Sequence, residues 1–353
     1  MADLQLDDLG EARIVTELIE PRFPRATSGL KSLDDCAMES IANGQVVHTA
    51  DPCPMPVVFS LFDPDPYHYG WMVVLINASD IAAMGATPLH VLLLIEAPGS
   101  MRVTSFVRIL EGVRDASSEM SLPVSGGNIR DAEKLGVHGV ALGLLDNTTA
   151  IQRAKVEDNQ SIWVAGNTGH FWASVVLADK IGYRNAIEDE TVSRALTRPL
   201  PQTKFAQELS RRGLSNAGMD ASDGVMAALY SLASASNVEV CVDLDRVELN
   251  AWCLEVSARV GLDPLSASLA WGDWQLVFTI DPRNESQVLE LGREFGVSLQ
   301  RWGVAKKRGN TSVSFKRNKT SIEIPDLMPN KFDRARQGWS YADWLNYIRK
   351  AKI

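Results

Sequence analysis

Apolar positions along the first 150 residues follow two different spacings. The segment 69–86 has the length and periodicity of a helix, whereas 88–98, with the apolar stretch 91–95 at its centre, is typical of a buried strand. The segment 104–120 predicts an amphipathic helix, because apolar residues recur there at helical spacing: Val107, Leu110 and Val113, with Ile109 adding an i+4 step. We expect further strands at 44–51 and 137–145, and a short strand entering a Gly-Gly turn at 122–128.

The second half repeats the alternation. A strand that ends in a Gly-containing turn is expected at 160–171, followed by a helix that closes at Gly182. The polar, proline-bearing stretch 183–202 predicts a loop or a surface crossing. The remaining predictions are helices near 203–212, 225–236 and 286–296, a turn at 222–224, and strands at 237–245, 274–281, 300–305 and 312–316. Strands alternating with helices indicate an α/β or α+β architecture.

Composition sharpens this picture. A length of 353 residues suggests about two domains, and we place the boundary near residue 150, giving domains 1–150 and 151–353. The 45% hydrophobic and 22% charged content is typical of globular chains. The net charge of −9 argues against a nucleic-acid partner. The basic run 301–319 therefore predicts a solvated sheet edge.

The N-terminus and the cysteines indicate where the chain works. The first residues lack a basic start and an apolar stretch, so we expect no secretory signal. The apolar runs are shorter than the roughly 20 residues of a membrane-spanning helix, so no membrane partner is expected. No C-x-x-C pair occurs, so a zinc site or disulfide framework is not expected from Cys36, Cys53, Cys241 and Cys253. We predict a reducing, cytoplasmic setting.

Candidate chemistry is concentrated in acids that lie beside Gly, Ser or Ala. The common phosphate-binding and hydrolase motifs (Walker A, G-x-G-x-x-G and G-x-S-x-G) do not occur, and the five histidines are scattered. Taken singly, each acid also fits a helix cap or turn. Together they offer the oxygen ligands that Mg²⁺ prefers, and the Gly-Gly pair can approach phosphates. The set comprises Asp34, Asp35, Asp51, Asp80, Asp220 and Asp223, with Gly126, Gly127 and Asn128. Asp80, inside an apolar segment, needs a partner or a metal.

In order along the chain, these motifs resemble the AIR-synthase-related (PurM-like) superfamily, and within it most closely the thiamine-monophosphate kinase family. The resemblance covers nearly the whole chain, and Ser79–Ala86 is its most specific part. Its other parts are SLDDCAM, HTAD, SGGN, RPLPQ, MDASDGV, WGDWQLVFT and QGWSY.

The resemblance implies an α+β fold of two domains. The N-terminal domain would pair through its sheet in a homodimer, and ATP would lie between the domains with several magnesium ions. The implied metal ligands are Asp34, Asp35, Asp51, Asp80, Asp220 and Asp223, of which Asp35 and Asp223 are also the implied catalytic residues. The implied nucleotide contacts are Thr49, Gly126, Gly127, Asn128, Arg153 and Ser222.

The chain departs from the family pattern mainly on the substrate side. Asn128 stands where the family has a metal-binding Asp, and Leu33 where it has a Gly. Gly272 stands where the family has a substrate-side Glu, and Val58 where it has a His. Trp271, Asp273 and Trp339 remain as candidate substrate contacts; Trp339 equally fits a side chain that packs the C-terminal segment onto the body.

Three functions follow as hypotheses. The first is an ATP- and Mg²⁺-dependent phosphotransferase that acts on a small molecule other than thiamine monophosphate. The second is a ligase that activates its substrate by phosphorylation and then forms an amide or closes a ring. The third is a degenerate member that binds nucleotide without turnover, as the changes at Asn128, Leu33 and Gly272 suggest.

Overall fold

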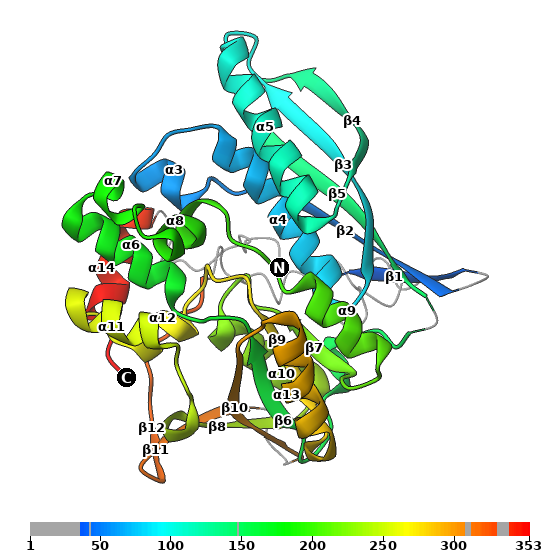
Figure 1. Cartoon of the computed structure of the whole chain (residues 1–353), viewed down its shortest axis with the longest axis vertical. Helices are drawn as coiled ribbons and strands as arrows, with labels where there is room; N and C mark the ends of the chain where they lie inside the picture. Colours follow the sequence, from blue (N-terminus) through cyan, green and yellow to red (C-terminus); the bar gives the residue numbers. More distant parts are fainter. Residues whose placement is uncertain (1–35, 42–43, 147, 308–311, 330–338) are drawn as a thin grey trace, which may run out of the picture.

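Two β-sheets organise the chain (Figure 1). The computed structural model describes residues 36–41, 44–146, 148–307, 312–329 and 339–353. In Figure 1 the first sheet lies at the upper right with α5, and the second sheet lies at the bottom. The first sheet ends at residue 145 and the second begins at residue 161, on either side of the boundary predicted near residue 150. The architecture is α+β, as predicted; the division into domains remains a prediction.

The first sheet has the strand order β1-β2-β5-β3-β4. Two helices, α4 (Tyr67–Ala83) and α5 (Val103–Met120), pack on one face of it, and the short α3 (Val57–Leu61) precedes them. All pairs are antiparallel except β3 with β4. The strands are β1 (Ala37–Ile41), β2 (Gly44–Pro52), β3 (Thr87–Ala97), β4 (Val124–Asp131) and β5 (Gly136–Leu145).

The second sheet has the order β12-β11-β8-β10-β6-β9-β7. Only the β8–β11 pair is parallel. The strands are β6 (Ser161–Ala165), β7 (Ala217–Asp220), β8 (Glu239–Asp243), β9 (Leu276–Ile280), β10 (Leu299–Lys306), β11 (Ser312–Arg317) and β12 (Thr320–Ile322). The α-helices of this half are α6 (His170–Ile181), α7 (Tyr183–Ala186), α8 (Glu190–Thr197), α9 (Thr203–Arg211), α10 (Val225–Ser236), α11 (Ala251–Val260), α12 (Pro264–Leu269), α13 (Glu285–Phe295) and α14 (Tyr341–Lys350). Short 3₁₀ turns occur at η4 (Arg153–Lys155), η5 (Leu244–Arg246) and η6 (Pro282–Asn284).

Three local predictions were wrong. The predicted loop 183–202 contains α7 and α8, because Asp189 caps α8 and Val192 and Leu196 bury one face of it. The predicted Gly-Gly turn is the middle of β4, where pairing with β3 extends the backbone. The basic run 301–319 is not simply a sheet edge, because its first part forms β10 between β8 and β6.

The two halves share buried surface. Val57 and Val58 of α3 belong to the core of the second half, and Ala82 and Ala83 of α4 pack against α9 side chains. Trp71 Nε1 donates to the backbone oxygen of Pro199 at 3.0 Å. The helices α3 and α4 thus tie the first sheet to the second half.

Two further findings concern the setting of the chain. No helix in the described part of the chain is both long and apolar enough to cross a membrane. Cys36, Cys53, Cys241 and Cys253 are all free thiols.

Candidate active site

The first group of predicted site residues comes together at the end of β2. Thr49 Oγ1 donates to Asp80 Oδ2 at 2.5 Å and lies 3.0 Å from Asp51 Oδ2. Alternation along β2 places Thr49 and Asp51 on the side of the sheet that faces α4, which carries Asp80. Asp80 therefore has the partner that its apolar surroundings require.

The second group lies at the end of β7. Asp220 is 3% exposed and accepts hydrogen bonds from Ser79 Oγ at 2.7 Å and Ser222 Oγ at 3.1 Å. Burial raises the pKa of Asp220 and the nearby Asp223 raises it further, whereas Ser79, Arg153 and Ser222 oppose this rise. A cation beside Asp220 and Asp223 would relieve both costs.

The two groups meet through consecutive residues of α4. Ser79 reaches Asp220 in the second half, while Asp80 reaches Thr49 in the first. The site therefore spans both halves, and six predicted residues converge on it: Thr49, Asp51, Asp80, Arg153, Asp220 and Ser222. Asp223 joins them through its effect on Asp220.

The glycine segment 126–128 lies across the first sheet from Asp51, at the far end of one row of paired residues. Asp51 pairs with Gly139, Gly139 with Leu93, and Leu93 with Gly127. Three strand spacings separate Asp51 from Gly127, roughly 14 Å. A Cβ on Gly127, whose φ is +153°, would overlap the backbone oxygen of Leu93, so only glycine fits there.

Asn128 follows Gly127 and pairs with Leu94. Gly126, Gly127 and Asn128 are all exposed on β4. The carboxylates and the glycine segment thus lie in one row of the first sheet, with the buried Gly139 and Leu93 between them.

Asp34, Asp35 and Leu33 lie outside the described residues. Within the described ranges, no three His, Cys, Asp or Glu side chains lie close enough to hold a metal ion by themselves. The described carboxylates instead form two pairs, Asp51 with Asp80 and Asp220 with Asp223. Pairs of this kind fit Mg²⁺, which commonly takes one or two carboxylates and completes its shell with phosphate oxygens and water.

The loop before β9 contains the predicted substrate residue Asp273. Its carboxylate caps α6, because it accepts from Gly169 N at 2.6 Å and from Phe171 N at 2.7 Å. Burial raises the pKa of Asp273 to about 7, and the two N–H groups oppose the rise. Trp274 follows with φ +56°, a strained conformation for a bulky residue, and its ring packs against the core of the first half.

Packing fills the space at both positions where this chain departs from the family's substrate-side Glu and His. A Cβ on Gly272 (φ +114°) would overlap the Phe171 ring, so a larger side chain does not fit there. Val58 is 2% exposed in the core of the second half.

The two candidate aromatic residues join one cluster. Trp271 packs against Trp172 and Trp344, with ring centroids 5.0 Å and 5.8 Å apart. Trp339 packs against Trp344 at 5.2 Å and Tyr347 at 5.4 Å. Trp339 thus packs against α14, which follows it, beside the core of the second half.

Sequence reasoning missed a cavity of about 390 Å³ beside this loop, lined by Asn167, His170, Gln202, Asp273, Gln275 and other residues. Only Asp273 was a candidate beforehand. The missed residues come from four separate segments without a shared motif, so no local signal could have grouped them.

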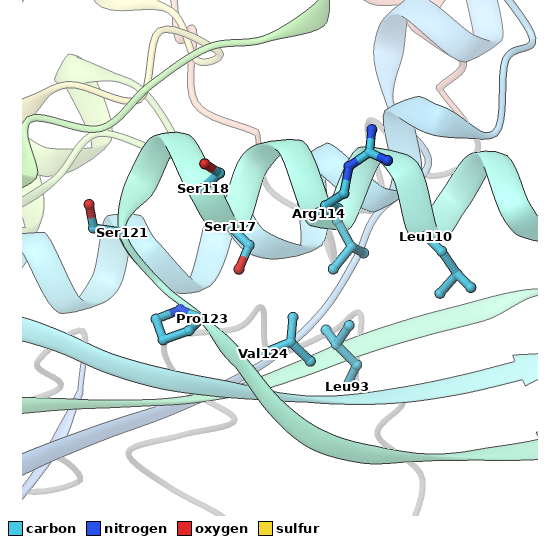
Figure 2. A pocket seen from close by; sticks show the side chains of 9 residues that line it. Leu93, Leu110, Arg114, Ser117, Ser118, Ser121, Pro123 and Val124 are labelled. Atoms are coloured by element: carbon cyan, nitrogen blue, oxygen red, sulfur yellow. The ribbon is translucent and has the colours of Figure 1, made fainter.

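A second hollow lies between α5 and the start of β4 (Figure 2). Its volume is about 690 Å³, and its lining is mostly apolar, with Leu93, Leu110 and Val124 around a single charged residue, Arg114. No carboxylate lines it, so it is separate from the acid groups.

Comparison with known proteins shows which families this chain is similar to. Residues 33–145 match the N-terminal domain of AIR synthase related proteins. A thiamine-monophosphate kinase of Pyrococcus abyssi is 25% identical over 317 residues, which cover 89% of this chain and 93% of that protein. A thiamine-monophosphate kinase of Aquifex aeolicus is 28% identical over 279 residues, 78% of this chain and 87% of that protein.

A solved structure described as AaThiL complexed with AMPPCP and TMP has the same fold. Its TM-score is 0.77 at 23% identity, and the match covers 93% of this chain and 99% of that one. The two-domain fold expected from the sequence is therefore confirmed.

Proposed function

We propose that this chain, which is similar to AIR synthase related proteins and to thiamine-monophosphate kinases, is an ATP- and Mg²⁺-dependent phosphotransferase that acts on a small molecule. One observation carries the proposal: carboxylates from both halves meet around α4, with Thr49, Asp51 and Asp80 on one side and Ser79 and Asp220 on the other. Phosphoryl transfer depends mainly on positioning and on neutralising phosphate charge, and this arrangement suits both needs.

The chain's own residues divide the work. Asp51, Asp80, Asp220 and Asp223 would hold magnesium, which supplies charge neutralisation at the phosphates. Asp34 and Asp35, which lie outside the described residues, are proposed as further magnesium ligands. Asp35 and Asp223 are proposed to act closest to the phosphate that is transferred. Gly126, Gly127 and Asn128 would contact the nucleotide at the far end of the row, and Arg153 and Ser222 at the carboxylate end.

We further propose that the acceptor is not thiamine monophosphate. The Phe171 ring occupies the space that a side chain at residue 272 would need, and Val58 is buried. Trp339 contacts α14. All three positions where the family pattern places substrate contacts therefore serve packing in this chain, although the carboxylate pairs are retained.

We also propose that the protein is a cytoplasmic homodimer. Leu92, Leu94, Val140 and Leu142 lie on the face of the first sheet turned away from α4 and α5, and Leu94 is 42% exposed. Covering this face with a second copy would bury apolar surface. Sedimentation velocity at micromolar concentration tests the dimer; a monomer at all concentrations contradicts it. The free cysteines support a reducing compartment.

Isothermal titration with a non-hydrolysable ATP analogue, with and without Mg²⁺, tests nucleotide binding. We expect Mg²⁺-dependent binding that Asp51→Asn and Asp80→Asn each weaken by at least tenfold. Asp281→Asn, which removes a carboxylate paired with Arg283 on the surface, is the matched control and should bind as wild type does. Absence of binding up to millimolar nucleotide would refute the proposal.

A further inference from the structure

The cavity beside the β9 loop lies at the same sheet edge as the carboxylates. Gly166 and Asn167 follow the carboxyl end of β6, and Asp220 ends β7. Both strands pair with β9, at Ala165 with Leu276 and Asp220 with Leu276. Only β9 separates the cavity from Asp220, so the two lie roughly 10 Å apart across two strand spacings.

Gln275 connects the two places directly. Its backbone oxygen accepts from Ala221 N at 2.7 Å, beside Asp220. Its side chain lines the cavity, where Nε2 donates to the backbone oxygens of Asn167 and Asp273 and Oε1 accepts from Gln202. A molecule held in the cavity can therefore extend past Gln275 toward the carboxylates.

The residues that line the cavity disfavour binding of an anion. The N-terminus of α6 would ordinarily attract a phosphate, but the Asp273 carboxylate already accepts from Gly169 N and Phe171 N. Arg194, at the rim, is paired with Glu119 at 2.9 Å. Burial lowers the pKa of His170, although Asn250 and Asp189 oppose this, so burial disfavours the charged form of its ring.

One buried polar atom in the lining calls for a hydrogen bond. His170 Nε2 has no hydrogen-bond partner among the described residues, although it is shielded from solvent. His170 also packs against Trp252, with ring centroids 4.7 Å apart, which fixes the imidazole plane. Buried polar groups rarely remain unpaired, and because His170 lines the cavity, a small shift of its ring on ligand binding would give this nitrogen a partner.

We propose that this cavity, the amide pocket (Asn167, His170, Gln202, Asp273 and Gln275), binds the phosphoryl acceptor, and that the acceptor is a small uncharged molecule bearing hydroxyl groups. This assignment rests on the phosphotransferase function proposed above. The acceptor oxygen forms a bond to the γ-phosphorus of ATP while the bond from that phosphorus to the β,γ-bridging oxygen breaks. ADP leaves, and the hydroxyl proton passes to solvent.

Mass spectrometry of a cell metabolite extract, incubated with the protein and ATP labelled in its γ-phosphate, identifies the labelled product. We expect its acceptor to carry no phosphate before the reaction. Ser298→Trp and Thr191→Trp place a large ring in the amide pocket from its lining and should lower kcat/KM for that acceptor at least tenfold, with KM for ATP unchanged. The matched control is Glu188→Trp, exposed just before α8 and outside the lining.

A histidine series refines the test. His170→Ala should raise KM for the acceptor about tenfold with little change in kcat, and His170→Gln, which keeps a hydrogen-bonding group, should lose less. An acceptor that is already phosphorylated, or wild-type kcat/KM in both tryptophan variants, overturns the pocket assignment. Failure of the wild-type protein to label any product overturns phosphotransfer itself, and with it any acceptor assignment.

Discussion

The hydrogen bond from Ser79 to Asp220 makes a sharp test of how the two halves hold the site together. The two atoms lie 2.7 Å apart, and the residues are 2% and 3% exposed. Ser79→Ala removes the donor and leaves a buried carboxylate with one partner fewer. Hydrogen bonds to charged groups contribute about 1.5–3 kcal/mol, so we expect the free energy of unfolding to fall by that amount near pH 8.

The loss should depend on pH. Burial raises the pKa of Asp220 above its value in the unfolded chain, and the Ser79 bond opposes that rise. Without Ser79 the pKa of Asp220 rises further, so the variant loses stability at a pH at which the wild-type Asp220 carboxylate is charged. In acid, where Asp220 is protonated in both proteins, the difference should shrink. Urea unfolding followed by tryptophan fluorescence, at pH 8 and in mildly acidic buffer, measures it.

Ser174 supplies a matched control. It is also a buried helical serine, fully inaccessible to solvent, but its Oγ has no hydrogen-bond partner among the described residues. Ser174→Ala removes the same atom and should be neutral or slightly stabilising at both pH values. If Ser79→Ala and Ser174→Ala shift the urea midpoint equally, or if the Ser79→Ala penalty does not change with pH, the reasoning about Asp220 is wrong.

Two further predictions concern the loop before β9. Gly272→Ala should cost about 1–2 kcal/mol for an alanine at positive φ and about 1–3 kcal/mol for overlap with the Phe171 ring. Thermal unfolding should therefore show a much larger loss of stability than for the control Gly261→Ala, where the φ is +75° and no atom lies within 4 Å. Equal losses of stability in the two variants would contradict the conclusion that Phe171 fills this space. Asp273 has a pKa raised to about 7, so its contribution to stability is complete below the unfolded value near 4 and is lost as pH rises to about 7. Asp273→Asn should therefore flatten the stability profile between roughly pH 4 and 7, and an unchanged slope would contradict the assigned pKa.

Local patterns predicted most of the elements. The helices α4, α5 and α10 and the strands β2, β3, β5 and β9 lie within a few residues of their expected positions, because their apolar spacing and their packing agree. The failures occurred where tertiary contacts outweighed local signals. Polar α8 is stabilised by burial of only Val192 and Leu196, and β4 is extended because β3 lies beside it.

The candidate site also contains residues that the sequence predicted and one that only the structure revealed. Asp51, Asp80 and Asp220 were chosen from the residue types at element ends, and Thr49 and Ser222 from the family resemblance. The structure places Thr49 beside Asp51 and Asp80, and Ser222 beside Asp220. The role of Ser79 as the link between Asp220 and the first half was not visible, because a serine inside an apolar helix carries no pairing signal of its own.

The sequence by itself determined the elements, the acid set and the family resemblance, since each depends on residues close together in the chain. The tertiary structure alone decided the pairings over long separations. It joined Ser79 to Asp220, placed Asp273 on the N-terminus of α6, and filled the space beside Gly272 with Phe171. These contacts form because buried polar groups need partners and close packing fills interior space, and which residues meet those needs depends on how the whole chain is arranged.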